Sequence, residues 1–325
     1  MLLALFFFEL YSYIKDIHDF RAVKFSGTYV DNPNVSGDKK ILGYGPKEDT
    51  SFQVTAIRKN NDSVIFNVVF SFKNGKRYTP EVNDTAQEYC VFLGCSHVFG
   101  DGLNDNQTLP YFFNLYTHRK FNVINMAFNG YGPHQALKIT EEILLKNQGV
   151  LDGKKGTVIY SFIPSHFIRA GGKVPWDQKG PWYEVENDSL VFKGSFADKH
   201  SPDNFFTLRW KIIWQNSNLY KSFFYPDTED KDVERTIKIV EKMATHFSEK
   251  GIKFIVLITT FKKDSENVIT FIDNLKKSGI SYFLLDSIIL DIKTNHDLYF
   301  IKGDGHPNEL HNKKIAEFLA KQITQ

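Results

Sequence analysis

The stretch YCVFLGCSHVFG, residues 89–100, joins an apolar run to a single serine, Ser96, that follows a glycine and a cysteine. Consecutive apolar side chains are typical of a strand that is buried on both faces of a parallel sheet. Ser96 is then expected at the carboxyl end of this strand, close to backbone N–H groups that no helix has used, and such groups can stabilise an oxyanion. A serine at a strand end can also simply cap a turn. The rest of the chain decides between a nucleophile and a turn hydroxyl.

Similar apolar runs recur after about residue 86 and alternate with helical stretches. This alternation predicts a parallel sheet with helices on both of its faces. The five strands are expected within YCVFLG (89–94), NVINMA (122–127), TVIYSFI (157–163), KFIVLIT (253–259) and YFLLD (282–286), and the helices after Thr108-Leu109-Pro110 and over about 133–147, 230–250, 264–277 and 308–322.

Residues 25–85 have a different pattern from the main domain, which we place at 86–325. They hold β-branched and aromatic runs with turn signals between them, for example at Asn74-Gly75. This pattern predicts a small β-rich unit of two or three strands.

An aromatic-rich insertion is expected inside the main domain, at about 170–225. It contains all four tryptophans of the chain and a hairpin pattern around Asn187-Asp188. The insertion leaves the carboxyl end of a strand, and doubly wound sheets bind their ligands at that edge.

The amino terminus, residues 1–24, begins with the apolar run MLLALFFF. This run is too short to span a bilayer, and it lacks the basic start and the cleavage site of a secretory signal. Two interpretations stay open: an amphipathic helix of the folded protein, or the end of a membrane anchor that begins upstream. The second would give N-terminal membrane association.

The charge balance and the cysteine positions argue against a nucleic-acid partner, a disulfide and a metal site. The chain has 325 residues, and its 40 Lys and Arg against 38 Asp and Glu leave a formal charge of +2, so no strong field attracts nucleic acid. Cys90 and Cys95 lie five apart in one strand and point to opposite faces, which predicts no disulfide. No Cys and His residues have zinc spacing, so we expect no metal.

The far end of the chain offers a partner for Ser96. In the segment IKGDGHPNELHN, residues 301–312, Asp304 and His306 lie two apart just before the last predicted helix. A serine nucleophile needs a base, and the base needs a carboxylate that orients it, so one loop could supply both. Taken alone, the same residues could form a turn and a helix cap.

Together these segments resemble the SGNH hydrolase family, also called GDSL-type esterases, over about residues 88–322. Gly94-Cys95-Ser96 stands at the family's G-D-S block, and Gly130 in NMAFNGYG (125–132) matches the glycine of its second block. The resemblance implies a three-layer α/β/α flavodoxin-like sandwich with a five-stranded parallel sheet. It also implies that Ser96 is the nucleophile of a triad with His306 and Asp304, and that Ser96 and Gly130 donate their N–H groups to the oxyanion.

The sequence departs from the family pattern in two places. The third block, usually G-x-N-D, reads Ile163-Pro164-Ser165-His166, so Ser165 and His166 are the substitute oxyanion donors, and Arg169 follows where an arginine is frequent. Cys95 replaces the aspartate of the first block and is a second candidate nucleophile, because a thiolate attacks more readily than a hydroxyl.

The resemblance implies a carboxylic ester hydrolase or O-acyl transferase that acts on an acylated carbohydrate or small ester without a cofactor. The D-x-H-P-N form resembles the branch found in cell-surface polysaccharide acetylation, which implies a place in the cell envelope. Trp176, Trp182 and Arg169 are the expected substrate-binding residues. The missing asparagine leaves an alternative: a catalytically silent protein that binds a glycan or a partner.

Overall fold

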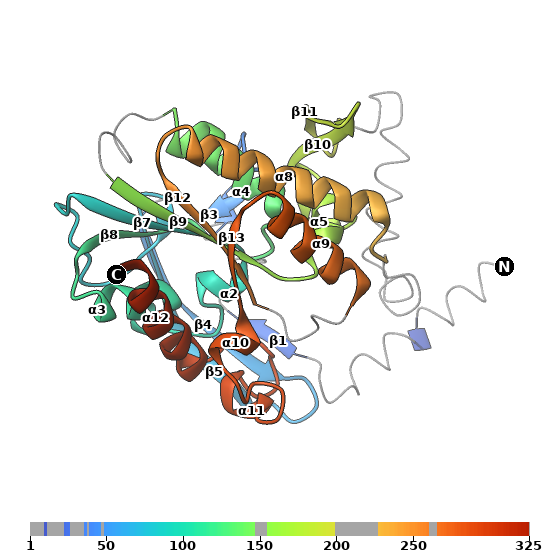
Figure 1. Ribbon diagram of the computed structural model, residues 1–325. Helices are drawn as coiled ribbons and strands as arrows, with labels where there is room; N and C mark the ends of the chain where they lie inside the picture. Colours follow the sequence, from blue (N-terminus) through green and yellow to red (C-terminus); the bar gives the residue numbers. More distant parts are fainter. Residues whose placement is uncertain are drawn as a thin grey trace.

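A mixed sheet forms the centre of the protein in the computed structural model (Figure 1). Among the described residues this sheet has nine strands in the order β1-β4-β5-β6-β8-β7-β9-β12-β13. The structure describes residues 10–11, 23–26, 36–37, 39–46, 49–146, 155–198, 227–259 and 265–324.

Five neighbouring strands of this sheet run parallel, as the sequence predicts. Numbered along the chain they lie in the order 2-1-3-4-5, which is the flavodoxin-like arrangement, and the order reverses between β7 and β9. Ligands bind such sheets at the carboxyl ends of the strands beside this reversal. The five strands are β7 (Glu88–Leu93), β8 (Phe121–Asn125), β9 (Lys155–Phe162), β12 (Lys253–Ile258) and β13 (Ser281–Leu284).

Helices cover both faces of the parallel strands and complete the three layers (Figure 1). Helices α3 (Leu109–Tyr116) and α12 (Glu309–Thr324) pack together on one face, and α4 (Pro133–Ile139), α8 (Asp230–Ser248) and α9 (Glu266–Lys277) form the other layer. Along α8 the residues Val233, Ile237 and Val240 recur at helical spacing and are buried, so the amphipathic pattern of the sequence fixes which side of α8 faces the sheet.

The strands of the region predicted as a small β-rich unit continue the same sheet. Strands β4 (Thr50–Arg58) and β5 (Val64–Lys73) pair antiparallel, and the short β6 (Lys76–Arg77) joins them to β8 through the pair Arg77 and Asn125. In β5 every second side chain from Phe66 to Phe72 is buried, and Phe70 contacts Phe99 of the main domain. These strands have one apolar face, which they bury against the common core.

Part of the predicted aromatic insertion forms a hairpin of β10 (Pro181–Glu186) and β11 (Ser189–Ser195), with Asn187 and Asp188 at positive φ in the turn. Residues 199–226, with Trp210 and Trp214, lie outside the described residues. The remaining elements are short: β1 (Val23–Ser26), β2 (Ser36–Gly37), β3 (Gly45–Pro46), α2 (Ser96–Phe99), α5 (His166–Ala170), α10 (Leu285–Ile288), α11 (His296–Tyr299), the 3₁₀ turns Asp105–Gln107 and Pro175–Asp177, and a π-helical turn, Thr140–Leu144.

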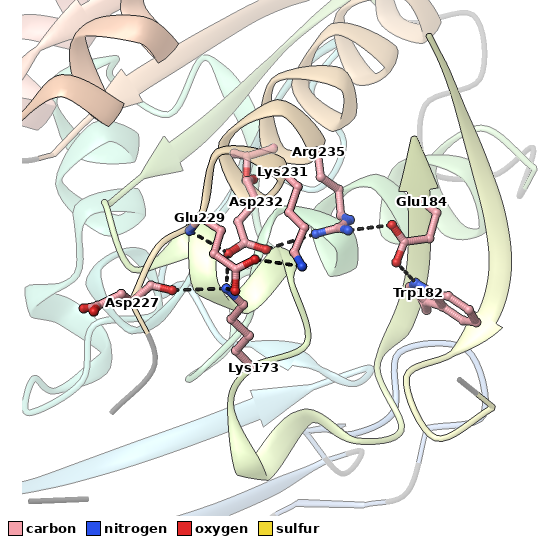
Figure 2. Close-up of polar contacts among 9 residues, drawn as sticks. Lys173, Trp182, Glu184, Asp227, Glu229, Lys231, Asp232 and Arg235 are labelled. Atoms are coloured by element: carbon pink, nitrogen blue, oxygen red, sulfur yellow. Dashed lines mark hydrogen bonds and ion pairs between the residues drawn. The ribbon is translucent and has the colours of Figure 1, made fainter. Parts of the chain in front are cut away.

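An ion-pair network fastens the hairpin to α8 (Figure 2). Lys173 Nζ lies 2.6 Å from the fully buried carboxylate of Asp232, and Arg235 bridges Asp232 at 3.2 Å to Glu184 of β10 at 2.5 Å. Trp182 Nε1 donates to the other oxygen of Glu184 at 2.7 Å. Two cations therefore surround the buried Asp232, which is what a buried charge requires.

The prediction for residues 1–24 falls almost wholly outside the described residues. Within the described part of the chain, no helix has the length and apolar character that crossing a membrane demands.

Candidate active site

Ser96 begins α2, a single helical turn at the carboxyl end of β7. Glycines bound this turn: Gly94 before it has φ +150°, and Gly100 after it has φ +85°, in the region that favours glycine. The N–H groups of Gly100 and Asp101 both donate to the Ser96 carbonyl, at 2.9 and 3.1 Å. The turn therefore fixes Ser96 at the sheet edge beside the reversal in strand order.

The structure brings Ser96, His306 and Asp304 together. Ser96 Oγ lies 2.9 Å from His306 Nε2, and Asp304 Oδ2 lies 2.5 Å from His306 Nδ1. The Asp304 carboxylate can only accept at Nδ1, so it selects the tautomer in which Nδ1 carries the proton and Nε2 can accept the proton of Ser96. The loop that holds His306 is itself fixed, because the His306 carbonyl accepts the N–H of Ile301 at 2.8 Å.

The surroundings of His306 favour its charged form. Burial alone would lower the pKa of this imidazole, but the hydrogen bond to Asp304 and the negative charges of Asp101 and Asp304 outweigh burial and raise the pKa to about 9. His97, next to the serine, has a pKa well below its usual value because it is buried and because His306 lies nearby. The imidazole that faces the serine is thus a base that becomes available as pH rises.

Two backbone N–H groups are the oxyanion donors that the sequence predicts. The N–H groups of Ser96 and Gly130 make no hydrogen bond within the described residues. Gly130 has φ +76°, and a Cβ added to it would lie 2.7 Å from both Trp176 Nε1 and the Tyr44 hydroxyl. Only glycine fits this position.

Side chains hold each carbonyl of the loop around Gly130. The Tyr44 hydroxyl donates to the Asn129 carbonyl at 3.1 Å, Trp176 Nε1 donates to the Gly130 carbonyl at 3.3 Å, and Arg169 Nη1 donates to the Tyr131 carbonyl at 2.8 Å. In a planar trans peptide the N–H of one residue points opposite to the preceding carbonyl. The Tyr44 bond therefore fixes the direction of the Gly130 N–H. We call Tyr44, Trp176 and Arg169 the carbonyl clamp.

The predicted substrate-binding residues divide between the clamp and the hairpin. Trp176 is 49% exposed, so one part of its indole remains open to solvent while its N–H serves the loop. Arg169 reaches the same loop. Trp182 instead contributes to the network between β10 and α8 (Figure 2).

The structure does not present His166 to a substrate. Its ring is fully buried, and Nδ1 is 2.7 Å from the Tyr160 hydroxyl, beside the ring of Phe162. A helix begins at His166 and turns the side chain toward apolar neighbours in the core. Ser165, which is half-buried at the end of this loop, is the more accessible residue of the predicted pair.

Cys95 directly precedes Ser96 and is closed off from solvent. Its side chain is fully buried and unpaired with the other cysteine, and it is an N-cap with extended dihedral angles. Because a nucleophile must contact its substrate, the structure favours Ser96 over Cys95.

Sequence reasoning missed Tyr44 and Asp101. Tyr44 lies 52 positions before Ser96 in LGYGP, between two glycines, and nothing in that segment relates it to the second block. Asp101 follows the serine turn directly, and its position after Gly100 was the one signal available.

Fold and site together define a class: a flavodoxin-like α/β/α protein with a Ser-His-Asp arrangement at the carboxyl edge of its sheet. No protein-family model and no curated protein matches the sequence. Among solved structures the chain is similar to a member of the lipolytic protein G-D-S-L family from Veillonella parvula DSM 2008, with 10% identity, 73% of this chain and 97% of that chain covered, and a TM-score of 0.42. It is also similar to the psychrotrophic esterase EstA from Pseudoalteromonas sp., with 11% identity, coverages of 73% and 99%, and a TM-score of 0.41.

Proposed function

We propose that this protein is a serine-dependent carboxylic ester hydrolase in which Ser96 is the nucleophile, His306 the general base and acid, and Asp304 the residue that orients the base. The observation that carries the proposal is the chain of two short contacts, 2.9 Å from Ser96 to His306 and 2.5 Å from His306 to Asp304. The nitrogen that faces the serine is the one that the Asp304 bond leaves without a proton.

In the first half of the reaction Ser96 Oγ attacks the ester carbonyl while its proton passes to His306 Nε2. The carbonyl oxygen becomes an oxyanion and accepts the N–H groups of Ser96 and Gly130. When the tetrahedral intermediate collapses, the bond to the alcohol breaks, and His306 gives the proton to the leaving alkoxide. The products are an acyl-serine and a free alcohol.

In the second half water or a hydroxyl group attacks the acyl-serine. His306 takes the proton of the attacking group, the acyl–oxygen bond to Ser96 breaks, and the proton returns to Ser96. Water gives a carboxylic acid, whereas a sugar hydroxyl gives a new ester. Because the two halves use the same groups, hydrolysis and O-acyl transfer differ only in the acceptor.

An acylated carbohydrate is the substrate that we propose. Trp176 supports this choice, because an exposed indole beside the oxyanion loop is a surface on which a sugar ring can stack. We further propose that the protein works in the cell envelope and is associated with the membrane through residues 1–24, on the strength of their apolar character.

Hydrolysis of p-nitrophenyl acetate by the purified protein tests the proposal. We expect Ser96→Ala to lower kcat/KM by about 10³-fold or more, and Cys95→Ala, the matched control one position away, to retain most of the activity. A fluorophosphonate should add to Ser96 in the wild-type protein, as seen by mass spectrometry of the labelled peptide. Equal rates for the wild type and Ser96→Ala would overturn the proposal for this acyl group.

A second candidate is a catalytically silent binding protein, and one observation favours it. At the end of β9 one of the two predicted substitutes for the third oxyanion donor is withdrawn, because the ring of His166 is buried against Tyr160. Loss of one such donor typically costs about 10²–10³ in kcat. If acetyl, butyryl and octanoyl esters all survive and Ser96 takes no label, this candidate replaces the first.

A further inference from the structure

Asp101 places a carboxylate between His306, the candidate base, and Asn129, the residue before Gly130. Its side chain is 9% exposed, and Oδ2 lies 4.0 Å from His306 Nε2, the ring nitrogen that faces Ser96. The same oxygen accepts a hydrogen bond from Asn129 Nδ2 at 2.8 Å. One oxygen atom thus faces both the base and the residue that precedes Gly130.

The backbone makes this position rigid. Asp101 follows the turn of α2, and its N–H donates to the carbonyl of Ser96 at 3.1 Å. Gly100, at φ +85°, allows the chain to close in this way, and a Cβ there would lie 2.5 Å from a methyl group of Thr108. Asp101 therefore cannot move independently of the nucleophile.

We propose that Asp101 is a positioning residue that holds the Asn129–Gly130 peptide and the His306 ring in one arrangement around Ser96, and that its charge stabilises the imidazolium formed when Ser96 gives up its proton. The inference rests on the proposed function and assigns a role outside the triad. The two tasks are separable, because the hydrogen bond to Asn129 needs an acceptor, whereas the effect on His306 needs a charge.

The charged and titratable groups around His306 determine what removing this charge does. Asp304 lies on the Nδ1 side of the ring and Asp101 on the Nε2 side, and both favour the protonated ring. His97, whose pKa is well below its usual value, and the buried thiol of Cys95 complete the surroundings. Asp101 is thus the carboxylate outside the triad in this set, and its neutral amide analogue should lower the pKa of His306.

Asp101→Asn separates the two tasks. Its side chain keeps an oxygen that can accept from Asn129 but has no charge. We expect the limb of the pH profile of kcat/KM that reports His306 to move down by about one pH unit, and the plateau at high pH to fall about tenfold, because the imidazolium loses a stabilising charge. At pH 7 the two effects largely cancel.

Two matched variants complete the test. Asn129→Ala removes the hydrogen bond and keeps the charge, so we expect the limb to stay in place while kcat falls about tenfold with little change in KM. Asp101→Glu restores the charge and should return the limb toward its wild-type pH. An unmoved limb in Asp101→Asn, with the variant folded by circular dichroism, would overturn the inference.

A direct titration separates this inference from the proposed function. The pKa of His306 can be followed by ¹H–¹⁵N NMR of the imidazole in the wild-type protein and in Asp101→Asn, without any turnover. A lower pKa in the variant with no hydrolysis in either protein would sustain the effect of the Asp101 charge and remove the esterase. Hydrolysis by both proteins, with the same pKa of His306 in each, would sustain the esterase and overturn the effect of the Asp101 charge.

Discussion

The histidine–aspartate pairs His306–Asp304 and His134–Asp177 have different surroundings. His306 Nδ1 is 2.5 Å from Asp304, its side chain is 25% exposed, and its other nitrogen faces Ser96. His134 Nε2 is 2.6 Å from Asp177, neither side chain is exposed, and Gln135 Nε2 donates to both oxygens of the same carboxylate at 2.8 Å. The chemistry of the two pairs is the same, so the difference lies in the second ring nitrogen.

In the buried pair the second ring nitrogen, His134 Nδ1, is not available to a substrate. Within the described residues His134 Nδ1 is buried and has no hydrogen-bond partner, so no substrate reaches it. His134 and Gln135 open α4 directly after the Gly130 loop, and Asp177 ends the 3₁₀ turn that carries Trp176. The buried pair therefore joins α4 to the turn that carries Trp176 of the carbonyl clamp. A histidine–aspartate pair acts as a base only where a nucleophile and solvent meet its second ring nitrogen.

Replacing His306 should produce the largest effect. His306→Gln removes the base and keeps a similar volume, so we expect kcat to fall by about 10³–10⁴-fold with little loss of folding free energy at pH 9. Ester hydrolysis and chemical denaturation of the same sample measure the two quantities. If His306→Gln kept the wild-type rate of ester hydrolysis, His306 would have no more catalytic role than His134.

Replacing Asp177 should lower the free energy of unfolding strongly and the activity only slightly. Asp177→Ala leaves His134 and Gln135 buried without their acceptor, and we expect a loss of about 3 kcal/mol in the free energy of unfolding. Activity measured well below the melting temperature should fall by about tenfold or less, through Trp176. A loss of activity as large as that of His306→Gln, with no loss of stability, would contradict the structural role of this pair.

The pH dependence should distinguish the pairs further. The pKa of His306 is raised from its usual 6.5 to about 9, so its contribution to stability is complete below pH 6.5 and disappears as pH rises through 9, a change of up to roughly 3 kcal/mol. Activity should rise over the same interval, because the neutral imidazole is the base. Urea denaturation at pH 6 and pH 10 tests this, with His306→Gln as the control that should lack the His306 part of the slope.

The smallest effect is expected at Tyr44. Tyr44→Phe keeps the ring and removes the hydroxyl that holds the Asn129 carbonyl, so the Gly130 N–H loses its fixed direction. We expect kcat to fall by about tenfold with KM nearly unchanged, since the loss applies to the oxyanion. Tyr131→Phe, which removes a hydroxyl bonded to the Tyr44 carbonyl instead, is the matched control. Equal effects of the two variants would show that the hydroxyl of Tyr44 acts only through packing.

The sequence was sufficient for the parallel strands and for the residues that meet at Ser96. Each buried strand has its own apolar run, which is a local signal, whereas the meeting of Ser96 with the loop of Asp304 and His306 was expected from the resemblance to the SGNH hydrolase motifs. The pairing of β6 with β8 could not be predicted from the sequence. The two residues of β6 are too few to show a strand pattern, and the paired residues Arg77 and Asn125 lie 48 positions apart. Tyr44 and the pair His134 and Asp177 were missed for the same reason: their partners are set by the folded chain.

The contact between Ser96 and His306 joins residues 210 positions apart. At typical rates of synthesis, about 5–20 residues per second, Ser96 is added to the chain roughly 10–40 s before its base. During that interval strands β7, β8 and β9 can already pair, but the hydroxyl of Ser96 has no proton acceptor. Proton transfer from Ser96 therefore cannot begin until the loop before α12 has been synthesised and lies beside the serine.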